Sequence, residues 1–330
     1  MSERAIATTE NVNRDNWRLH EDGLFVATSA RVLANNMSEA YNQLGEDSEP
    51  SDKSLQAREK MRDFHESLGL RIDNAFVMKP QNNYSEDLGV VDVDSVFETG
   101  QGGVDATVSE DRADFLYTYN KNAILECRPA DCPVLTIKGT DANGQDVLSL
   151  LHVGWQGLNA GYLEQAFEKL DEMQVSSDSL RIQMSGAGYA DNFHYKNVEH
   201  PLDDSSRDGD KSKRFTHPDR LSLFVNVMDS GEVDQEGRTV WSFDMDMPGF
   251  IRTKLKDLGV DEYQLYEEGS DTASQDSGYS SHSRDAKDKT QNTRDVVIAT
   301  MGEQDQGIIA ARYARREGAA AVAAVSRSLH

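Results

Sequence analysis

One thiol and one imidazole stand at the ends of neighbouring apolar segments of this chain. Cys132 follows Asp131 and precedes an apolar run that begins at Pro133, and His152 ends a second apolar run twenty residues further on. A thiolate and an imidazole that meet can act as a nucleophile and its base, or can bind zinc through sulfur and nitrogen. We therefore take Cys132, His152 and Asp131 as candidate catalytic residues, and Cys132 and His152 as candidate metal ligands. The plainer alternative is a buried thiol and a core imidazole with ordinary partners.

Two strands must bring this pair together. Residues 133–138 and 147–153 are apolar, and the segment between them is dense in the turn residues Gly, Asn and Asp. This pattern predicts a β-hairpin. If the two strands pair, Cys132 and His152 approach each other at neighbouring strand ends.

The segment Gly154-Trp155-Gln156-Gly157 directly follows His152, and residues 160–173 then carry apolar side chains at helical spacing. Glycines between a strand and a helix let a ligand approach backbone N–H groups, where anions are favoured. The alternative is an ordinary tight turn.

The remaining pattern mixes strands and helices without strict alternation, which favours an α+β fold of mixed β-sheets flanked by helices over a doubly wound sheet. Further strands are predicted near residues 23–27, 74–78, 90–96, 123–127, 221–228, 239–243 and 296–301. Further helices are predicted near residues 54–68, 250–258 and 307–328. We expect a flexible segment over 1–20 and a single domain over 21–330, with polar insertions near 197–214 and 270–293.

Composition indicates a folded cytoplasmic protein. The chain has 330 residues, of which 37% are hydrophobic, enough to build a core. Its longest apolar run is far short of the roughly 20 residues that cross a bilayer, and its first residues contain no signal-peptide core. Its two cysteines, Cys127 and Cys132, are close in sequence and are expected as free thiols. We expect no membrane partner.

The charge of the chain is strongly negative. With 58 acidic and 34 basic residues, the formal net charge is −24. Such a field repels a phosphate backbone, so no nucleic-acid partner is expected. A high-salt host and a merely soluble surface both remain compatible with this acidity.

Two segments together carry a family resemblance. Residues 130–135 (ADCPVL) and 152–161 (HVGWQGLNAG) closely resemble the paired signature ADCxPV and HAGWRGxxxG of the YfiH-like laccase-domain family. Their order, their spacing and the helix that follows agree. Weaker similarities to that family occur at Thr28-Ser29-Ala30-Arg31, Val104-Asp105-Ala106, Gly186-Ala187-Gly188, Asp246 and Ser281-His282-Ser283-Arg284-Asp285.

The resemblance implies a mixed α/β fold with a zinc site formed by His, Cys and His. It also implies phosphorolysis of purine nucleosides, with adenosine deamination alongside, so a purine nucleoside and phosphate become the expected small-molecule substrates. Copper is not expected, because no His-rich copper motif is visible. The residues matched to substrate-binding positions are Arg31, Gly154, Trp155, Gln156, Gly157, His282 and Arg284.

Three departures bear on that site. The chain has Asn83 at the position expected for the third zinc ligand, Gln156 in place of an arginine, and Ser283 in place of another. An amide is a poor zinc ligand beside imidazole or thiolate. A weakened metal site is therefore expected. The alternatives are a non-catalytic ligand-binding or regulatory homologue, and a Cys132-dependent hydrolase of peptidoglycan precursors.

The other histidines are weaker candidates. His194 lies near the segment that resembles a family turn, where it is either structural or part of the pocket. The remaining ones are expected at the surface: His20, His65, His200, His217 and His330.

Overall fold

The computed structural model describes most of the chain. The described residues are 17–19, 24–28, 59, 61–66, 68–81, 87–98, 107–108, 111–187, 189, 194–197, 223–269, 272 and 295–302. The predicted insertions near 197–214 and 270–293 and the predicted helix over 307–328 lie almost wholly outside these residues.

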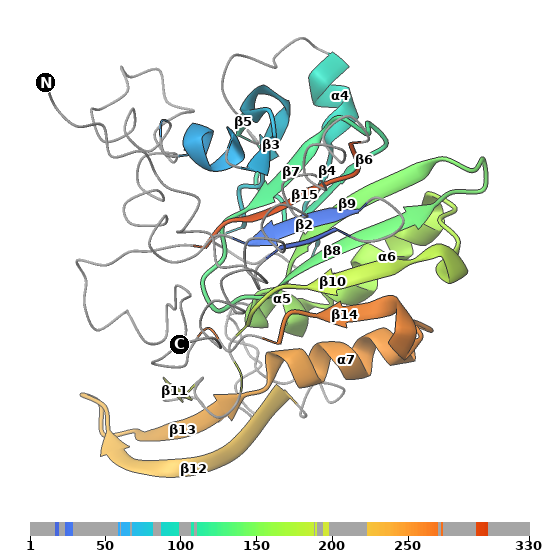
Figure 1. The fold of residues 1–330 in the computed structure, drawn as a ribbon. Helices are drawn as coiled ribbons and strands as arrows, with labels where there is room; N and C mark the ends of the chain where they lie inside the picture. The colour runs from blue at the N-terminus through green and yellow to red at the C-terminus, as the bar shows by residue number, and fades with distance from the viewer. Residues whose placement is uncertain are drawn as a thin grey trace, which may run out of the picture.

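Two six-stranded mixed sheets form the body of the protein (Figure 1). The first sheet has the order β1 (Trp17–Leu19), β2 (Phe25–Thr28), β15 (Val297–Thr300), β7 (Ile124–Cys127), β3 (Ala75–Val77) and β5 (Thr107–Val108). The second sheet has the order β14 (Leu265–Glu267), β10 (Arg181–Met184), β8 (Val134–Thr140), β9 (Asp146–His152), β6 (Phe115–Thr118) and β4 (Val90–Asp92).

The two sheets pack face to face. One apolar cluster combines Val26, Leu125 and Ala299 of the first sheet with Val134 and Leu150 of the second. All of these side chains are buried, as the near-continuous apolar character of the central strands leads one to expect. The chain passes from the first sheet to the second between β7 and β8, and that connection carries Cys132.

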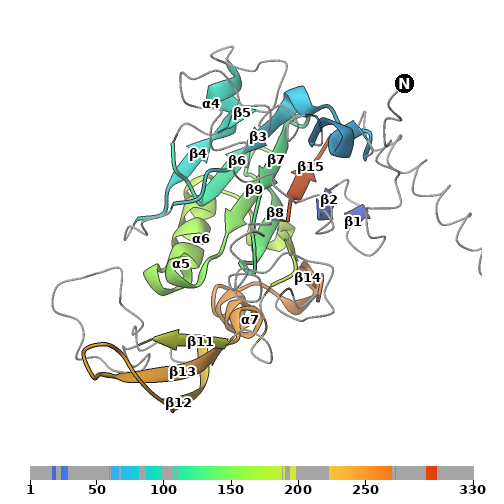
Figure 2. The same cartoon turned by 90° about the vertical axis from the view of Figure 1, so that its left-hand side faces the viewer.

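Helices cover the outer faces of both sheets (Figure 2). The outer face of the second sheet is covered by α5 (Trp155–Ala160), α6 (Tyr162–Glu172) and α7 (Met247–Asp257). The outer face of the first sheet contacts the helical residues 61–66 and 68. This four-layer arrangement confirms the expected class of mixed sheets flanked by helices. Three short 3-10 turns, η3 (Ile72–Asn74), η4 (Ser177–Ser179) and η8 (Glu262–Gln264), connect these elements.

The start of α7 is fixed by local chemistry. Asp246 is the N-cap residue, and its carboxylate accepts a hydrogen bond from the N–H of Gly249 at 2.9 Å. Pro248 follows in the first turn, where its fixed φ fits a helix start. Asp246 therefore serves as a helix cap in this fold.

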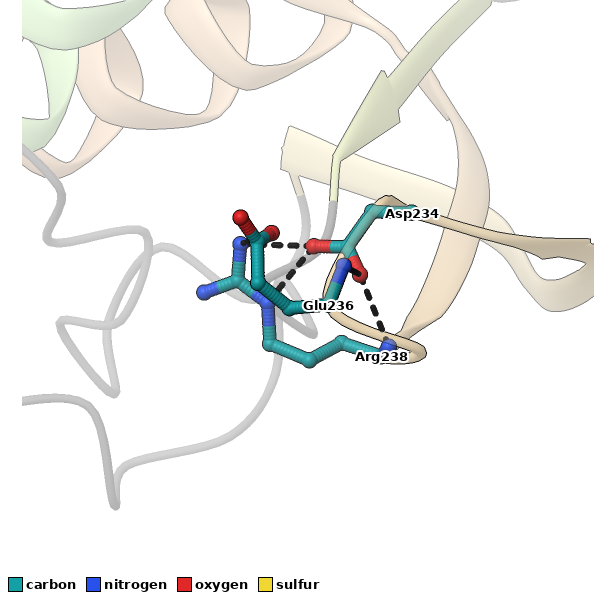
Figure 3. A network of polar contacts seen from close by, with 3 residues as sticks. All are labelled: Asp234, Glu236 and Arg238. Atoms are coloured by element: carbon teal, nitrogen blue, oxygen red, sulfur yellow. Dashed lines mark hydrogen bonds and ion pairs between the residues drawn. The ribbon is translucent and has the colours of Figure 1, made fainter.

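A third, three-stranded sheet extends from this body (Figure 1). Its order is β11 (His194–Asn197), β13 (Thr239–Met245) and β12 (Phe224–Val233), and all pairs are antiparallel. At the turn between β12 and β13, the carboxylate of Asp234 accepts hydrogen bonds from the backbone N–H groups of Glu236 and Arg238 and from the guanidinium of Arg238 (Figure 3). These contacts close the turn.

The strand predicted over residues 90–96 is only partly correct, because the strand ends at Asp92 and α4 (Val93–Glu98) begins. The carboxylate of Asp92 accepts a hydrogen bond from the N–H of Asp94 at 3.1 Å, which satisfies a donor of the first helical turn. Strands β6 and β10 were not predicted. The hairpin of β8 and β9 is confirmed in full.

His65 was expected at the surface, and that expectation is wrong. The ring is fully buried, and its Nε2 atom lies 3.0 Å from a carboxylate oxygen of Glu126, which is also fully buried. The other oxygen of Glu126 accepts hydrogen bonds from Nε and a terminal nitrogen of Arg128 at 2.8 and 2.6 Å. A polar residue on an apolar helix face is favourable here because its partner lies beneath it on β7.

This buried network should make the stability of the fold depend on pH. Burial raises the pKa of Glu126, but the charge of Arg128 and the hydrogen bond with His65 outweigh it and hold the pKa below its usual value. Such a carboxyl stabilises the fold fully above its unfolded pKa of about 4.3, and that stabilisation is lost as the pH falls through the lower folded pKa. We expect the free energy of unfolding of the wild type to fall in this acid range, and to fall less in Glu126→Gln.

At neutral pH, Glu126→Gln is expected to lower the free energy of unfolding by about 3 kcal/mol, because it leaves Arg128 with a neutral partner. Asp73→Asn is the matched control, since Asp73 pairs with Arg71 at the exposed surface and such pairs contribute at most about 1 kcal/mol. Urea denaturation measures both. Equal losses of unfolding free energy in the two variants would contradict the claim that the buried His65–Glu126–Arg128 network stabilises the fold.

Candidate functional site

Asp114 and His152 are neighbours across the β6–β9 ladder. Phe115 pairs with Leu151 in antiparallel register, and the N–H of His152 donates to the carbonyl oxygen of Asp114 at 2.8 Å. Their side chains therefore lie on the same face. The Nδ1 atom of His152 lies 2.8 Å from Oδ1 of Asp114, and both side chains are buried. A carboxylate at this distance fixes the orientation of the ring and places a proton on Nδ1.

The β8–β9 ladder brings Cys132 close to the same residue. Val134 pairs with His152 in the β8–β9 ladder, and the N–H of Val153 donates to the carbonyl oxygen of Pro133 at 2.9 Å. Cys132 is among the groups that raise the pKa of His152, so its side chain lies close to the ring. Because Asp114 holds Nδ1, Nε2 is the nitrogen that a further partner of the ring would use. The structure thus brings the two residues together as the sequence predicts.

The partners of His152 stabilise its charged form. Burial lowers the pKa of the ring, but the hydrogen bonds and charges of Asp114 and Cys132 outweigh burial and raise the pKa of His152 to about 10. The second thiol differs. Burial, with the nearby groups of Asp114 and Cys132, raises the pKa of Cys127 well above its usual value. Cys132 is half-buried and is therefore the more accessible of the two thiols.

Comparison with known proteins places this site in a family. Residues 29–298, which include Asp114, Cys132 and His152, match the family described as multi-copper polyphenol oxidoreductase laccase. The chain belongs to this family. Comparison with curated proteins finds no match.

Solved structures of proteins from other organisms have a fold similar to that of this laccase-family chain. YlmD from Geobacillus stearothermophilus is 15% identical with a TM-score of 0.59, and the alignment covers 88% of this chain and 98% of that one. YfiH from Bacillus licheniformis is 16% identical with a TM-score of 0.54, covering 86% and 98%. A DUF152 protein from Neisseria meningitidis is 17% identical with a TM-score of 0.52, covering 88% and 98%. The predicted YfiH-like family and fold are confirmed.

The described residues of this family member do not fit a three-ligand zinc site. Cys132 and His152 supply two donors, whereas catalytic zinc ions use three protein ligands and an open position. Asp114 is already bound to the far nitrogen of His152, as an outer partner of a metal-binding histidine would be. Within the described part of the chain, no cluster of three His, Cys, Asp or Glu side chains is arranged to hold a metal.

Sequence reasoning missed Asp114. Its carboxylate also accepts a hydrogen bond from the N–H of Gln81 at 3.3 Å, so it joins His152 to the segment that leads to Asn83. The available signal was Ala113-Asp114, directly before the apolar residues of β6. The family's A-D-A segment was matched instead to residues 104–106, which lie outside the described residues.

Asp131 lies beside Cys132 but faces a different partner. Its side chain is 2% exposed, and Oδ1 accepts a hydrogen bond from the hydroxyl of Thr272 at 2.9 Å. Its backbone φ is 63°.

The Gly154–Gly157 segment is the start of α5 and not a separate turn. Gly154 is the N-cap residue, and the half-buried Trp155 ring lies 5.9 Å from that of Tyr195. A Cβ atom at Gly157 would come within 2.6 Å of the Tyr162 ring, so glycine is required there for packing. Gln156 is half-buried. Packing against Tyr162 therefore accounts for Gly157.

The other candidates are not brought to this pair by any described contact. The His194 ring is 63% exposed and pairs with Asp244 on the third sheet. Five matched positions lie outside the described residues: Arg31, Asn83, His282, Ser283 and Arg284.

Removing the carboxylate of Asp114 should lower the free energy of unfolding more than removing the carboxylate of the nearby Asp111. Asp114→Ala leaves Nδ1 of a buried ring unpaired, and we expect a loss of about 3 kcal/mol in the free energy of unfolding. Asp111→Ala is the control, because Asp111 is exposed in the same loop, and its effect should stay within about 0.5 kcal/mol. Urea denaturation at neutral pH measures both, and similar small losses would show that His152 does not depend on Asp114.

Position 83 offers a direct test of the missing ligand. The family resemblance puts position 83 where a third zinc ligand is expected, so we expect Asn83→His to add a donor to Cys132 and His152 and to raise the affinity for zinc at least about tenfold. Competition with a chromophoric chelator measures this affinity. Asn120→His is the control, since Asn120 is exposed at a strand end. Equal affinities in the two variants would show that position 83 does not face the pair.

Proposed function

We propose that this chain is an enzyme that processes purine nucleosides, by phosphorolysis of the base–sugar bond or by deamination of adenosine. The observation that carries this proposal is the row Asp114–His152–Cys132, in which Asp114 and His152 are buried and Cys132 is half-buried, inside the part of the chain that matches the laccase family. The family resemblance supplies the substrate class, and the row supplies the groups that can do chemistry on it.

In phosphorolysis, a phosphate oxygen bonds to the anomeric carbon of the ribose while the carbon–nitrogen bond to the base breaks. The base leaves with the electron pair and needs a proton. In this proposal His152 delivers that proton from Nε2, and Asp114 holds the ring in place on Nδ1. Cys132 lies close to the same ring and helps to keep it protonated, because it is among the groups that raise the pKa of His152.

The loss of a fixed cation affects the two reactions differently. Gln156 replaces an arginine that the resemblance predicts, and an amide does not neutralise phosphate as a guanidinium does. Deamination uses water in place of phosphate and does not need this cation. Phosphate-dependent and phosphate-independent product formation should therefore be measured separately.

A second candidate is a Cys132-dependent hydrolase, with a peptidoglycan precursor as its substrate. It is favoured by the order of the row, in which a carboxylate orients an imidazole that contacts a thiol. The thiolate would bond to a carbonyl carbon and expel the leaving amine or alcohol, which takes a proton from His152. Water would then release the acyl group and restore the thiol.

The test incubates the purified chain with adenosine or inosine, with and without phosphate, and measures free base, sugar phosphate and inosine. We expect turnover that falls about 10³-fold or more in Cys132→Ala and in His152→Ala. Cys127→Ala is the matched control and should keep the wild-type rate, because that thiol is fully buried.

The same variants are assayed on peptidoglycan precursors. Turnover of these substrates alone, lost in Cys132→Ala, would support the hydrolase instead. Binding of nucleoside without turnover of any substrate would indicate a non-catalytic homologue and would falsify the enzymatic proposal.

A further inference from the structure

The backbone at Asp131 is held in a conformation that side chains with a Cβ atom rarely adopt. Its φ of 63° lies in the left-handed region. Asp and Asn enter this region more readily than other non-glycine residues, but it still requires support from the surrounding structure. Cys132 is the next residue, so the direction of its side chain depends on this turn.

The support comes from a residue far away in sequence. The hydroxyl of Thr272 donates to Oδ1 of Asp131 at 2.9 Å, and both residues are 2% exposed. Thr272 is itself fixed, because its N–H donates to the carbonyl oxygen of Ala187 at 2.9 Å. A hydrogen bond to a buried carboxylate is among the stronger ones in a protein.

The loop is also fixed on both sides of Asp131. The N–H of Asp295 donates to the carbonyl oxygen of Pro129 at 2.9 Å, and that of Val153 donates to Pro133 at 2.9 Å. Backbone bonds from residues next to β15 and β9 thus hold both ends of a short connection. The side-chain bond from Thr272 acts directly on the strained residue between them.

We infer that the Asp131–Thr272 pair positions Cys132 against His152. Asp131 is then a positioning residue, and Thr272 becomes a second one that the sequence did not single out. This inference rests on the proposed function only in taking Cys132 as the reacting group. Without the hydroxyl of Thr272, the turn at Asp131 relaxes towards negative φ and carries the Cys132 sulfur away from the ring.

The test measures how strongly His152 controls the reactivity of Cys132. Iodoacetamide alkylates Cys132 at a rate followed by mass spectrometry of its peptide, and the rate is compared with and without His152→Ala. In the wild-type background we expect His152→Ala to change the rate on the order of tenfold. In Thr272→Val we expect the same replacement to change it less than about twofold. Thr272→Ser keeps the hydroxyl and should behave as the wild type.

Substitutions of Asp131 separate the backbone from the carboxylate. Asp131→Asn tolerates the left-handed region and retains an acceptor oxygen, so it should keep the coupling. Asp131→Gly adopts the same backbone freely but accepts no hydrogen bond, so it should lose the coupling without adding strain. Circular dichroism at the assay temperature verifies that each variant is folded. If Thr272→Val does not fold, Asp131→Gly replaces it as the variant that removes the side-chain hydrogen bond.

The outcomes separate the two claims. If His152→Ala leaves the alkylation rate unchanged even in the wild-type background, Cys132 and His152 are not coupled and the proposed function fails with the inference. If the coupling exists but persists in Thr272→Val and in Asp131→Gly, only the positioning role is overturned.

Discussion

The candidate site depends on one feature, the antiparallel ladder that β9 makes with β6 and β8. Register alone brings Asp114 and Val134 to the two sides of His152. The central strands are buried on both faces. If β9 shifted its pairing by one residue, each of its side chains would move from one apolar cluster to the cluster on the opposite face of the sheet. The core of the protein therefore fixes the relative position of the imidazole and its carboxylate.

Two sets of buried ionisable residues in this protein are matched with partners across the layers. His65, Glu126 and Arg128 are joined beneath the helical layer, and His152 lies between Asp114 and Cys132 at the end of β9. Each set joins a side chain from one element to a partner from another. A single unpaired member would carry a desolvation cost that the fold does not recover elsewhere. The charge of −24, by contrast, is a property of the chain as a whole and does not specify these pairs.

Local sequence patterns predicted the strands, turns and helices that neighbouring residues determine. The β8–β9 hairpin followed from two apolar runs separated by turn residues, and the helix after it followed from apolar residues at helical spacing. The Cys132–His152 approach followed from that hairpin. Asp114 was missed because β6 is brought beside β9 by a long-range pairing that no local pattern encodes. Asp131 was read as catalytic from its place beside Cys132, yet its partner Thr272 lies 141 residues away. His65 was assigned to the surface by its residue type, while its burial is decided by Glu126 on another element.

None of the helices in the described part of the chain is long and apolar enough to span a bilayer.

The central claim is that Asp114 holds Nδ1 of a buried His152 ring and that Cys132 interacts with the same ring. Nitrogen-15 NMR of the histidine rings tests it most directly, with His152→Gln identifying the signal. A proton on Nδ1 at neutral pH, protected from solvent exchange and lost or shifted in Asp114→Asn, is the predicted result, together with a shift at Nε2 when Cys132 is replaced by Ala. An unprotonated Nδ1, or an Nε2 signal indifferent to Cys132, would contradict the account.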